Sequence, residues 1–255
     1  MKNNILETKG VTKYFGGFRA LNNVSIGIKE GEVALVIGPN GSGKTTLINV
    51  ITGVLKADDG KIIFKGIDIT NKEPNILYHL GIVRTFQTPQ PLKELTVLEN
   101  LLIGAINIGE NPWKAFFYRT WLEQEEKLIE RALNILEFLK LSHLIERKAG
   151  ELSGGQMKLV EIGRALMTNP KIIIMDEPIA GVAPGLAHEI FAHILALKKR
   201  NISFLIIEHR LDIVLSYIDK LYVMFNGEII AKGEGQEEIK KVLQDPKVIE
   251  IYIGQ

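Results

Sequence analysis

A glycine-rich segment between an apolar run and a helical pattern constrains this chain more than any other feature. Val33 to Ile37 are all apolar, which suits a strand buried on both faces of a parallel sheet. Glycine then breaks the strand, and residues 44–52 have the spacing of a helix. A strand that turns into a helix in this way is a building unit of α/β folds. The segment between them is Gly38, Pro39, Asn40, Gly41, Ser42, Gly43, Lys44 and Thr45.

The order Gly-x-x-x-x-Gly-Lys-Thr in this context predicts a loop that binds the phosphates of a nucleotide. Glycines let backbone N–H groups turn inward around phosphate oxygens, and the helix that follows points its positive end at the same place. We expect Lys44 to reach the β and γ phosphates and the Thr45 hydroxyl to ligate Mg²⁺, with Thr46 in the same binding segment. The alternative is a glycine-rich turn with an incidental lysine, which the flanking strand and helix disfavour.

A second apolar run, Ile172 to Met175, ends in two acids, Asp176 and Glu177. The carboxyl end of a strand in an open α/β sheet meets the ligand crevice, so we expect both carboxylates there. Asp176 would hold Mg²⁺ through water, and Glu177 would orient or deprotonate an attacking water. An acidic strand end at the surface is the alternative. The phosphate loop upstream favours the site.

The remaining pattern predicts an α/β core interrupted by a helical insert. Residues 96–167 have apolar positions three and four apart, which is typical of helices. Strands are predicted over 5–11, 24–28, 60–64, 67–69, 82–86, 172–175, 204–207 and 221–225, and further helices over 186–199 and 235–243.

Bulk properties exclude several classes of protein. The chain has 255 residues, 46% hydrophobic and 24% charged, which is typical of a soluble globular protein. A net charge of +1 gives no basic field for nucleic acid. The absence of cysteine excludes disulfides and thiolate metal sites. The sequence has no apolar run long enough to span a bilayer and no signal-peptide core at its start, so we expect a cytoplasmic protein.

These motifs together resemble the ATP-binding cassette (ABC) ATPase family over essentially the whole chain. The order of the phosphate loop, Gln87, Leu152 to Gln156, Asp176-Glu177 and His209 carries the resemblance. It implies a P-loop NTPase (RecA-like) core with an antiparallel β subdomain and an inserted α-helical subdomain. The core would be residues 1–90 and 166–255, and the insert residues 91–165. It also implies hydrolysis of ATP to ADP with Mg²⁺.

The resemblance assigns three further site residues. Gln87 would touch Mg²⁺ or the attacking water and link hydrolysis to a transport partner. His209 would bond the γ-phosphate. Phe15 aligns with the aromatic residue that stacks on adenine, with Tyr14 as the neighbouring alternative, and either ring could instead belong to the core.

The run Leu152 to Gln156 reads LSGGQ, the signature of this family. Ser153 is a good N-cap, Gly154 and Gly155 leave backbone N–H groups bare, and a helix from about Gln156 to residue 167 would aim its N-terminus outward. In the family this segment closes on the γ-phosphate of ATP held by another subunit. The resemblance therefore implies a second cassette, identical or different, with two ATP molecules between the pair.

Two positions depart from the family pattern. Ala183 occupies the position where most members carry an Asp that bonds across the dimer, and Arg210 follows His209 where an Asp is frequent. Because the phosphate loop and the paired acids are intact, we still predict hydrolysis.

Within the family, the chain most resembles ATPase subunits of branched-chain amino acid importers, through residues 84–87, 176–181, 208–210 and 245–254. That implies membrane permease subunits as partners of the insert and the Gln87 region, an extracytoplasmic binding protein, and a place on the inner face of the membrane. Urea importers and lipopolysaccharide exporters share much of the pattern. A non-transport ABC ATPase and a P-loop kinase are weaker alternatives. For the segment from Trp113 to Trp121 we favour packing within the insert over a partner or bilayer contact.

Overall fold

The computed structural model describes residues 4–85, 91–105 and 118–253. Within this part of the chain, the larger sheet has the strand order β11–β10–β4–β9–β8–β7. Its strands pair in parallel except for β11, which runs antiparallel at one edge. Parallel strands joined through helices confirm the predicted α/β core. The strands are β4 (Val33–Ile37), β7 (Ile82–Thr85), β8 (Ile172–Asp176), β9 (Ser203–Ile207), β10 (Lys220–Phe225) and β11 (Glu228–Glu234).

A second, antiparallel sheet has the order β2–β1–β5–β6, with β3 also paired to β1. Its strands are β1 (Asn4–Phe15), β2 (Phe18–Val24), β3 (Gly27–Lys29), β5 (Asp59–Phe64) and β6 (Ile67–Asp68).

The prediction of one strand over residues 24–28 is wrong, because β2 ends before β3 begins. Thr8 explains the break. Its hydroxyl donates to Val24 O at 3.1 Å and accepts from Ile26 N at 2.9 Å, so a side chain takes two backbone groups that a strand would pair in a ladder.

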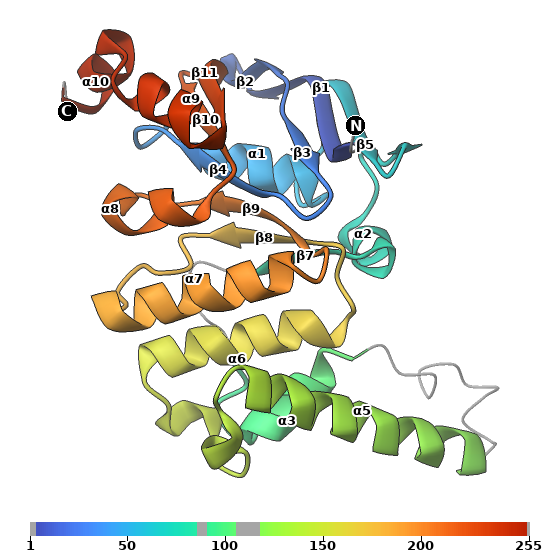
Figure 1. The fold of residues 1–255 in the computed structure, drawn as a ribbon. Helices are drawn as coiled ribbons and strands as arrows, with labels where there is room; N and C mark the ends of the chain where they lie inside the picture. The colour runs from blue at the N-terminus through green and yellow to red at the C-terminus, as the bar shows by residue number, and fades with distance from the viewer. Residues whose placement is uncertain (1–3, 86–90, 106–117, 254–255) are drawn as a thin grey trace.

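The central strands are buried on both faces, and successive residues of β4 enter different cores. Val33, Leu35 and Ile37 pack in the core that holds α6 (Gly154–Met167) and α7 (Pro184–Lys198). Ala34 and Val36 pack in the core that holds α1 (Lys44–Ile51) and the antiparallel sheet. Figure 1 shows the same layers, with α1 between the two sheets and α7 and α6 on the opposite side of the larger one.

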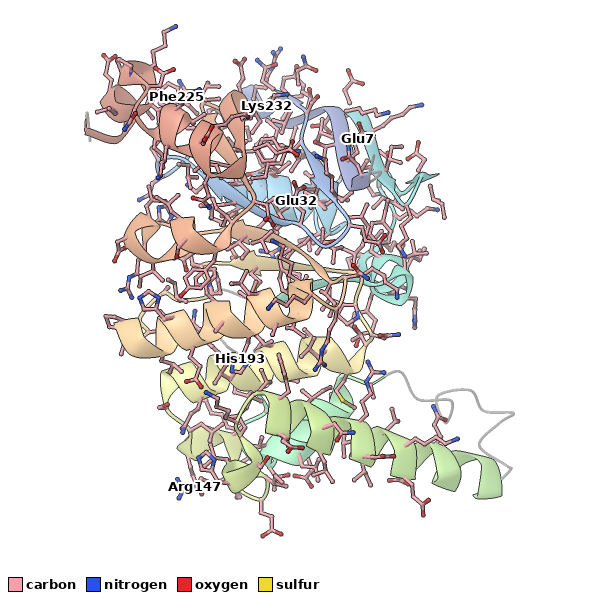
Figure 2. All side chains as sticks on the ribbon, viewed as in Figure 1. Glu7, Glu32, Arg147, His193, Phe225 and Lys232 are labelled. Carbon is pink, nitrogen blue, oxygen red and sulfur yellow. The ribbon has the colours of Figure 1, made fainter. Side chains whose placement is uncertain are left out.

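The insert supplies the helical layer beyond α7. α3 (Val97–Ile103), α5 (Tyr118–Phe138) and α6 contact one another at the end of the molecule far from the antiparallel sheet (Figure 1). His193 of α7 lies on the side that faces this layer, with its ring centroid 5.0 Å from that of Phe138 on α5 (Figure 2). The predicted division at residues 90/91 and 165/166 stays a prediction, and α6 runs across the second boundary. The remaining α-helices are α2 (Pro74–Leu80), α8 (Leu211–Val214), α9 (Gly235–Leu243) and α10 (Pro246–Ile253).

None of the helices in the described ranges combines the length and the apolar character needed to cross a membrane. The side chains of Trp113 and Trp121, for which we predicted packing within the insert, lie outside the described residues.

Candidate nucleotide-binding site

The loop between β4 and α1 is held by contacts that only glycine allows. A Cβ atom at Gly38 would lie 2.1 Å from the carbonyl oxygen of Met224, and one at Gly43 would lie 2.6 Å from that of Ala20. Gly43 also has a φ of 103°, in the region that favours glycine. Strands β10 and β2 therefore press against the loop and fix its path. The buried Ser42 Oγ has no hydrogen-bond partner among the described residues, so the loop offers an unused polar atom that suits a phosphate oxygen.

Lys44 begins α1 and turns back over the loop. Its Nζ donates to Gly38 O and Pro39 O, each at 2.8 Å, and the residue is only 7% exposed. Burial lowers the pKa of Lys44, while the carboxylates of Glu177 and Asp176 act in the opposite direction. No side chain caps the start of α1, so its first N–H groups are open to an anion. Thr45 is exposed beside them and Thr46 half-buried.

Asp176 ends β8 and is buried beside an arginine that sequence reasoning did not assign to the site. Arg84 Nη2 lies 3.5 Å from Asp176 Oδ2, and Arg84 Nη1 donates to Asn49 Oδ1 of α1 at 2.5 Å. Burial raises the pKa of Asp176, and Arg84 opposes that rise. Arg84 therefore joins β7, β8 and α1. The sequence did contain one sign of a role for this residue, since a charged side chain stands inside the apolar strand β7.

Glu177 and His209 meet at the ends of neighbouring strands. His209 Nε2 lies 3.2 Å from Glu177 Oε1, and both side chains are partly open to solvent. Glu177 has a φ of 50°, a left-handed conformation that costs a non-glycine residue about 1–3 kcal/mol. A bond from Glu177 N to Ile207 O at 2.9 Å helps to hold it there. Strain of this size persists where the surroundings impose it, so the position of the carboxylate is imposed by the fold.

The turn after β9 is tied to the loop after β8 by two charged side chains. The buried Glu208 accepts from Ile179 N at 2.9 Å and from His209 N at 3.0 Å. Arg210 Nη1 donates to Val182 O at 2.9 Å. This contact explains the departure at Arg210, since the guanidinium holds the loop within the same chain.

Ala183 is the N-cap of α7 and provides no side-chain acceptor for its first N–H groups. An Asp at an N-cap would accept one of those bonds. The departure therefore leaves the start of α7 without the side-chain cap that the family residue would supply.

Ser153 caps α6, as predicted. Its hydroxyl accepts from Gln156 N at 3.3 Å, and Gln156 Oε1 accepts from Ser153 N at 3.0 Å, which makes a capping box. The helix begins two residues earlier than expected, at Gly154. Gly154 has open space above it, whereas Gly155 is buried, and a Cβ there would lie 2.0 Å from Leu186 Cδ2. The burial of Gly155 concerns its Cα side, so the expectation that both glycines leave their backbone N–H groups bare stays a prediction.

The structure places the other expected residues as follows. Phe15 and Tyr14 are 48% and 40% exposed at the end of β1, which excludes the core alternative for both rings. The site is linked to this hairpin by the contact of Ala20 with Gly43.

Gln87 lies outside the described residues. Across residues 4–85, 91–105 and 118–253, no hydrogen bond or ion pair joins the segment from Ser153 to Gln156 to the phosphate loop.

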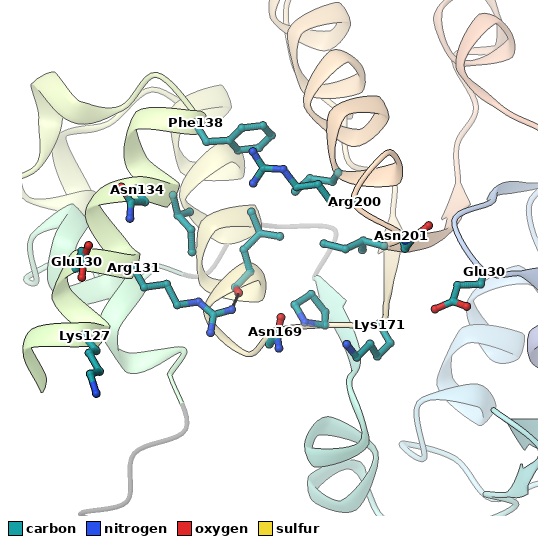
Figure 3. A pocket seen from close by; sticks show the side chains of 15 residues that line it. Glu30, Lys127, Glu130, Arg131, Asn134, Phe138, Asn169, Lys171, Arg200 and Asn201 are labelled. Atoms are coloured by element: carbon teal, nitrogen blue, oxygen red, sulfur yellow. Dashed lines mark hydrogen bonds between the residues drawn. The ribbon is translucent and has the colours of Figure 1, made fainter. Parts of the chain in front are cut away.

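The most voluminous of the cavities described lies elsewhere, at the opposite ends of the strands (Figure 3). It measures about 740 Å³, and Lys171 and Asn201, which precede β8 and β9, help to line it. Two of its cations have structural partners. Arg131 donates to Leu166 O at 2.8 Å, and Arg200 lies over the Phe138 ring. Because α6 and α7 direct their negative ends here, these two cations are placed to stabilise helix ends.

Three comparisons agree with this geometry. The ABC transporter family model matches residues 21–180. The chain is 72% identical to the probable branched-chain amino acid transport ATP-binding protein LivG of Methanocaldococcus jannaschii over 98% of both chains. It is 35% identical to the high-affinity branched-chain amino acid transport ATP-binding protein BraF of Pseudomonas aeruginosa over the full length of both.

Solved structures show the same fold. A nucleotide-free ATP-binding cassette from an ABC transporter superposes with a TM-score of 0.88 at 72% identity, over 99% of this chain and 100% of that one. The ADP conformation of a cassette gives the same TM-score and identity over 99% of each. A dimeric post-hydrolysis cassette bound to ADP and phosphate gives 0.72 at 28% identity, over 90% of this chain and 98% of that one. The chain therefore belongs to the ABC transporter family, as one of its ATP-binding and ATP-hydrolysing cassettes.

Proposed function

We propose that this cassette powers the import of branched-chain, hydrophobic amino acids through separate membrane permease subunits. ATP hydrolysis is supported by one observation, a cluster of charged side chains at the carboxyl ends of the parallel strands. The cluster consists of Lys44, Asp176, Glu177 and His209. The assignment of the cargo rests on relatives named for branched-chain amino acid transport, at 72% and 35% identity. Urea import and lipopolysaccharide export are the competing cargoes.

The roles we assign follow from position and chemistry. Lys44 holds the β and γ phosphates, with the backbone of residues 38–43 around them. His209 bonds the γ-phosphate, and Glu177, 3.2 Å from it, orients and deprotonates the attacking water. Phe15 stacks on the adenine, and Gln87 contacts the metal or the water.

Mg²⁺ fits the donor set, and we propose Thr45, Asp176 and Gln87 as its contacts. A hydroxyl, an amide oxygen and one buried carboxylate are oxygen donors of the kind this ion takes, alongside water and substrate phosphates. Bound there, it would neutralise the charge on the β and γ phosphates. The positive charge of Arg84 beside Asp176 favours the ionised form of this buried carboxylate, which is the form that binds a cation. The ion would then share the carboxylate with the guanidinium.

We propose that a second cassette completes each site. Ser153, Gly154, Gly155 and Gln156 would meet the γ-phosphate held by the neighbour, and the open face above Gly154 supports that contact. The partner is a second copy of this chain or a different cassette. Without an acid at Ala183, communication across the pair relies on other contacts.

We also propose where the permease docks. A cavity of about 380 Å³ opens between α2, β7 and α6, beside Arg84 and close in sequence to Gln87. Val54 and Tyr78 give it apolar walls, and Glu161 and Arg164 add charge. A short permease segment with an apolar side chain and flanking polar groups fits this lining. Docking would place the cassette on the inner face of the membrane, with an extracytoplasmic binding protein delivering the cargo outside.

The test of the hydrolytic pair uses Glu177→Gln. Loss of the base with binding intact should trap an ATP-bound dimer in size-exclusion chromatography, whereas Lys44→Ala, which cannot hold the phosphates, should stay monomeric. A Glu177→Gln variant that is monomeric at saturating ATP would contradict the shared site.

For the cargo, the cassette is purified from native membranes with its bound subunits and reconstituted in vesicles. ATP-dependent leucine uptake is expected, and uptake of urea instead would replace the assignment.

A further inference from the structure

One buried lysine on the signature helix contacts the backbone of the residue assigned as the base. Lys158 lies two positions after Gln156 on α6 and is 7% exposed. Its Nζ donates to the carbonyl oxygen of Glu177 at 2.8 Å. An ammonium group is costly to bury unless it is paired, so a lysine here needs the acceptors around it. Burial lowers the pKa of Lys158, and the carboxylates of Glu208, Glu161 and Glu177 act against that shift.

The contact falls at the strained residue of the site. Glu177 has a φ of 50°, and its backbone is held on both sides. Its amide donates to Ile207 O at 2.9 Å, while its carbonyl oxygen accepts from Ala180 N at 3.1 Å as well as from Lys158. The direction in which the Glu177 carboxylate leaves the chain depends on this backbone conformation. A shift of the carbonyl group therefore moves the carboxylate relative to His209.

The same helix begins with the signature segment. Ser153 and Gln156 form the capping box at the start of α6, and the buried Gly155 packs against Leu186 of α7. Lys158 is one to two turns further along this rigid element. A displacement of the helix start therefore reaches the Glu177 carbonyl through one side chain, with no intervening loop.

We propose that Lys158 is a positioning residue for hydrolysis, which fastens the signature helix to the backbone of Glu177 and so sets the carboxylate against the attacking water. The proposal rests on the proposed roles of Glu177 and of the signature segment. It adds a physical link within one chain between the surface that meets the neighbouring ATP and the base that acts on this chain's own ATP.

The test compares Lys158→Met, which keeps the length of the side chain and removes the donor, with Lys158→Arg, which keeps a charged donor. Lys220→Met is the matched control, because Lys220 is also buried, at 9% exposure, and its Nζ donates to a backbone carbonyl, Gly27 O, at 2.9 Å. All three are made in the full chain and assembled with its native partner subunits. Steady-state ATP hydrolysis and thermal unfolding are measured for each.

Lys158→Met should lower kcat by about 10- to 100-fold, the effect of a small misplacement of a catalytic group, while KM for ATP changes by less than about two-fold. Lys158→Arg should recover most of the loss. Lys220→Met should lower the melting temperature by a similar amount and leave kcat near the wild-type value.

Three outcomes would overturn the inference: an unchanged kcat in Lys158→Met, a loss that Lys220→Met reproduces, or a loss that appears equally in KM. Failure of the proposed function looks different, because the wild-type assembly itself would then hydrolyse ATP without moving leucine.

Discussion

Replacing Arg84 by methionine should expose how much the site depends on one buried ion pair. Arg84 and Asp176 have side chains that are 16% and 5% exposed, with Nη2 and Oδ2 at 3.5 Å. The same guanidinium donates to Asn49. Methionine fills a similar volume without the charge, so both polar partners lose the arginine while the packing of β7 is largely kept.

The magnitude follows from the distance. At an effective dielectric constant of about 20, two unit charges 3.5 Å apart attract by about 5 kcal/mol. Removing one partner of a buried pair typically costs 3–5 kcal/mol, because the other charge stays buried. Asp176 can take up a proton and recover part of this loss. We therefore expect Arg84→Met to lower the free energy of unfolding by about 3 kcal/mol at neutral pH.

The sign of the pH dependence is also fixed. Burial raises the pKa of Asp176 above its unfolded value of 3.8, and removing Arg84 raises it further. The folded variant then holds a proton that the unfolded chain releases, so its stability falls as the pH rises through the folded pKa. The penalty of Arg84→Met should be small near the unfolded pKa of 3.8 and grow as the pH rises from there through the raised folded pKa.

A double-mutant cycle in urea measures the pair directly. The variants are Arg84→Met, Asp176→Asn and the two combined, all without nucleotide. A coupling energy of about 3 kcal/mol is expected. A coupling below about 1 kcal/mol, as in solvent-exposed pairs, would refute the argument that burial makes this ion pair strong.

Two further predictions concern other parts of the molecule. His193→Gln should remove an acid sensitivity: burial lowers the pKa of His193 below 6.5, so the wild type loses up to about 1.4 kcal/mol per pH unit relative to the variant as the pH falls below 6.5, measured by urea unfolding. In the phosphate loop, Gly43→Ala should destabilise the chain more than Gly41→Ala. Both residues have positive φ, but only the Cβ at Gly43 meets a backbone atom, Ala20 O at 2.6 Å, and thermal unfolding compares the two.

Clear outcomes would contradict each of these. Parallel pH profiles for wild type and His193→Gln would mean that the ring is protonated without penalty in the fold. Equal losses in the two glycine variants would mean that strain alone, and not the contact with β2, sets the cost at Gly43.

The parts of the fold that local patterns determine could be predicted from the sequence. β4 has the bounds predicted, because five apolar residues followed by glycine allow few alternatives. β11 was missed for the opposite reason: as an antiparallel edge strand it buries little, and its apolar signal is weak. The break between β2 and β3 depends on Thr8, which is 16 residues from Val24, and no local pattern contains that contact.

The site divides in the same way. Lys44 begins the helix after the glycine-rich loop, and Asp176 and Glu177 follow an apolar strand, so recognisable motifs in the sequence indicated all three. Lys158 and Arg210 act through backbone carbonyls 19 and 28 residues distant. A backbone carbonyl carries no side-chain identity, so the sequence gives no sign of which residue accepts such a bond.

The two internal acceptors of Lys44 have a consequence for selectivity. Gly38 O and Pro39 O already satisfy two of the three ammonium hydrogens at 2.8 Å. To bind Lys44, a ligand must offer a stronger interaction than the two neutral carbonyl groups that the ammonium group already contacts. A neutral hydroxyl or a weakly charged anion gains little in that exchange, whereas adjoining phosphates with several negative charges gain much. A ligand therefore competes with the backbone carbonyl oxygens of the loop for the ammonium group of Lys44. A ligand with the charge density of a polyphosphate is strong enough to win this competition.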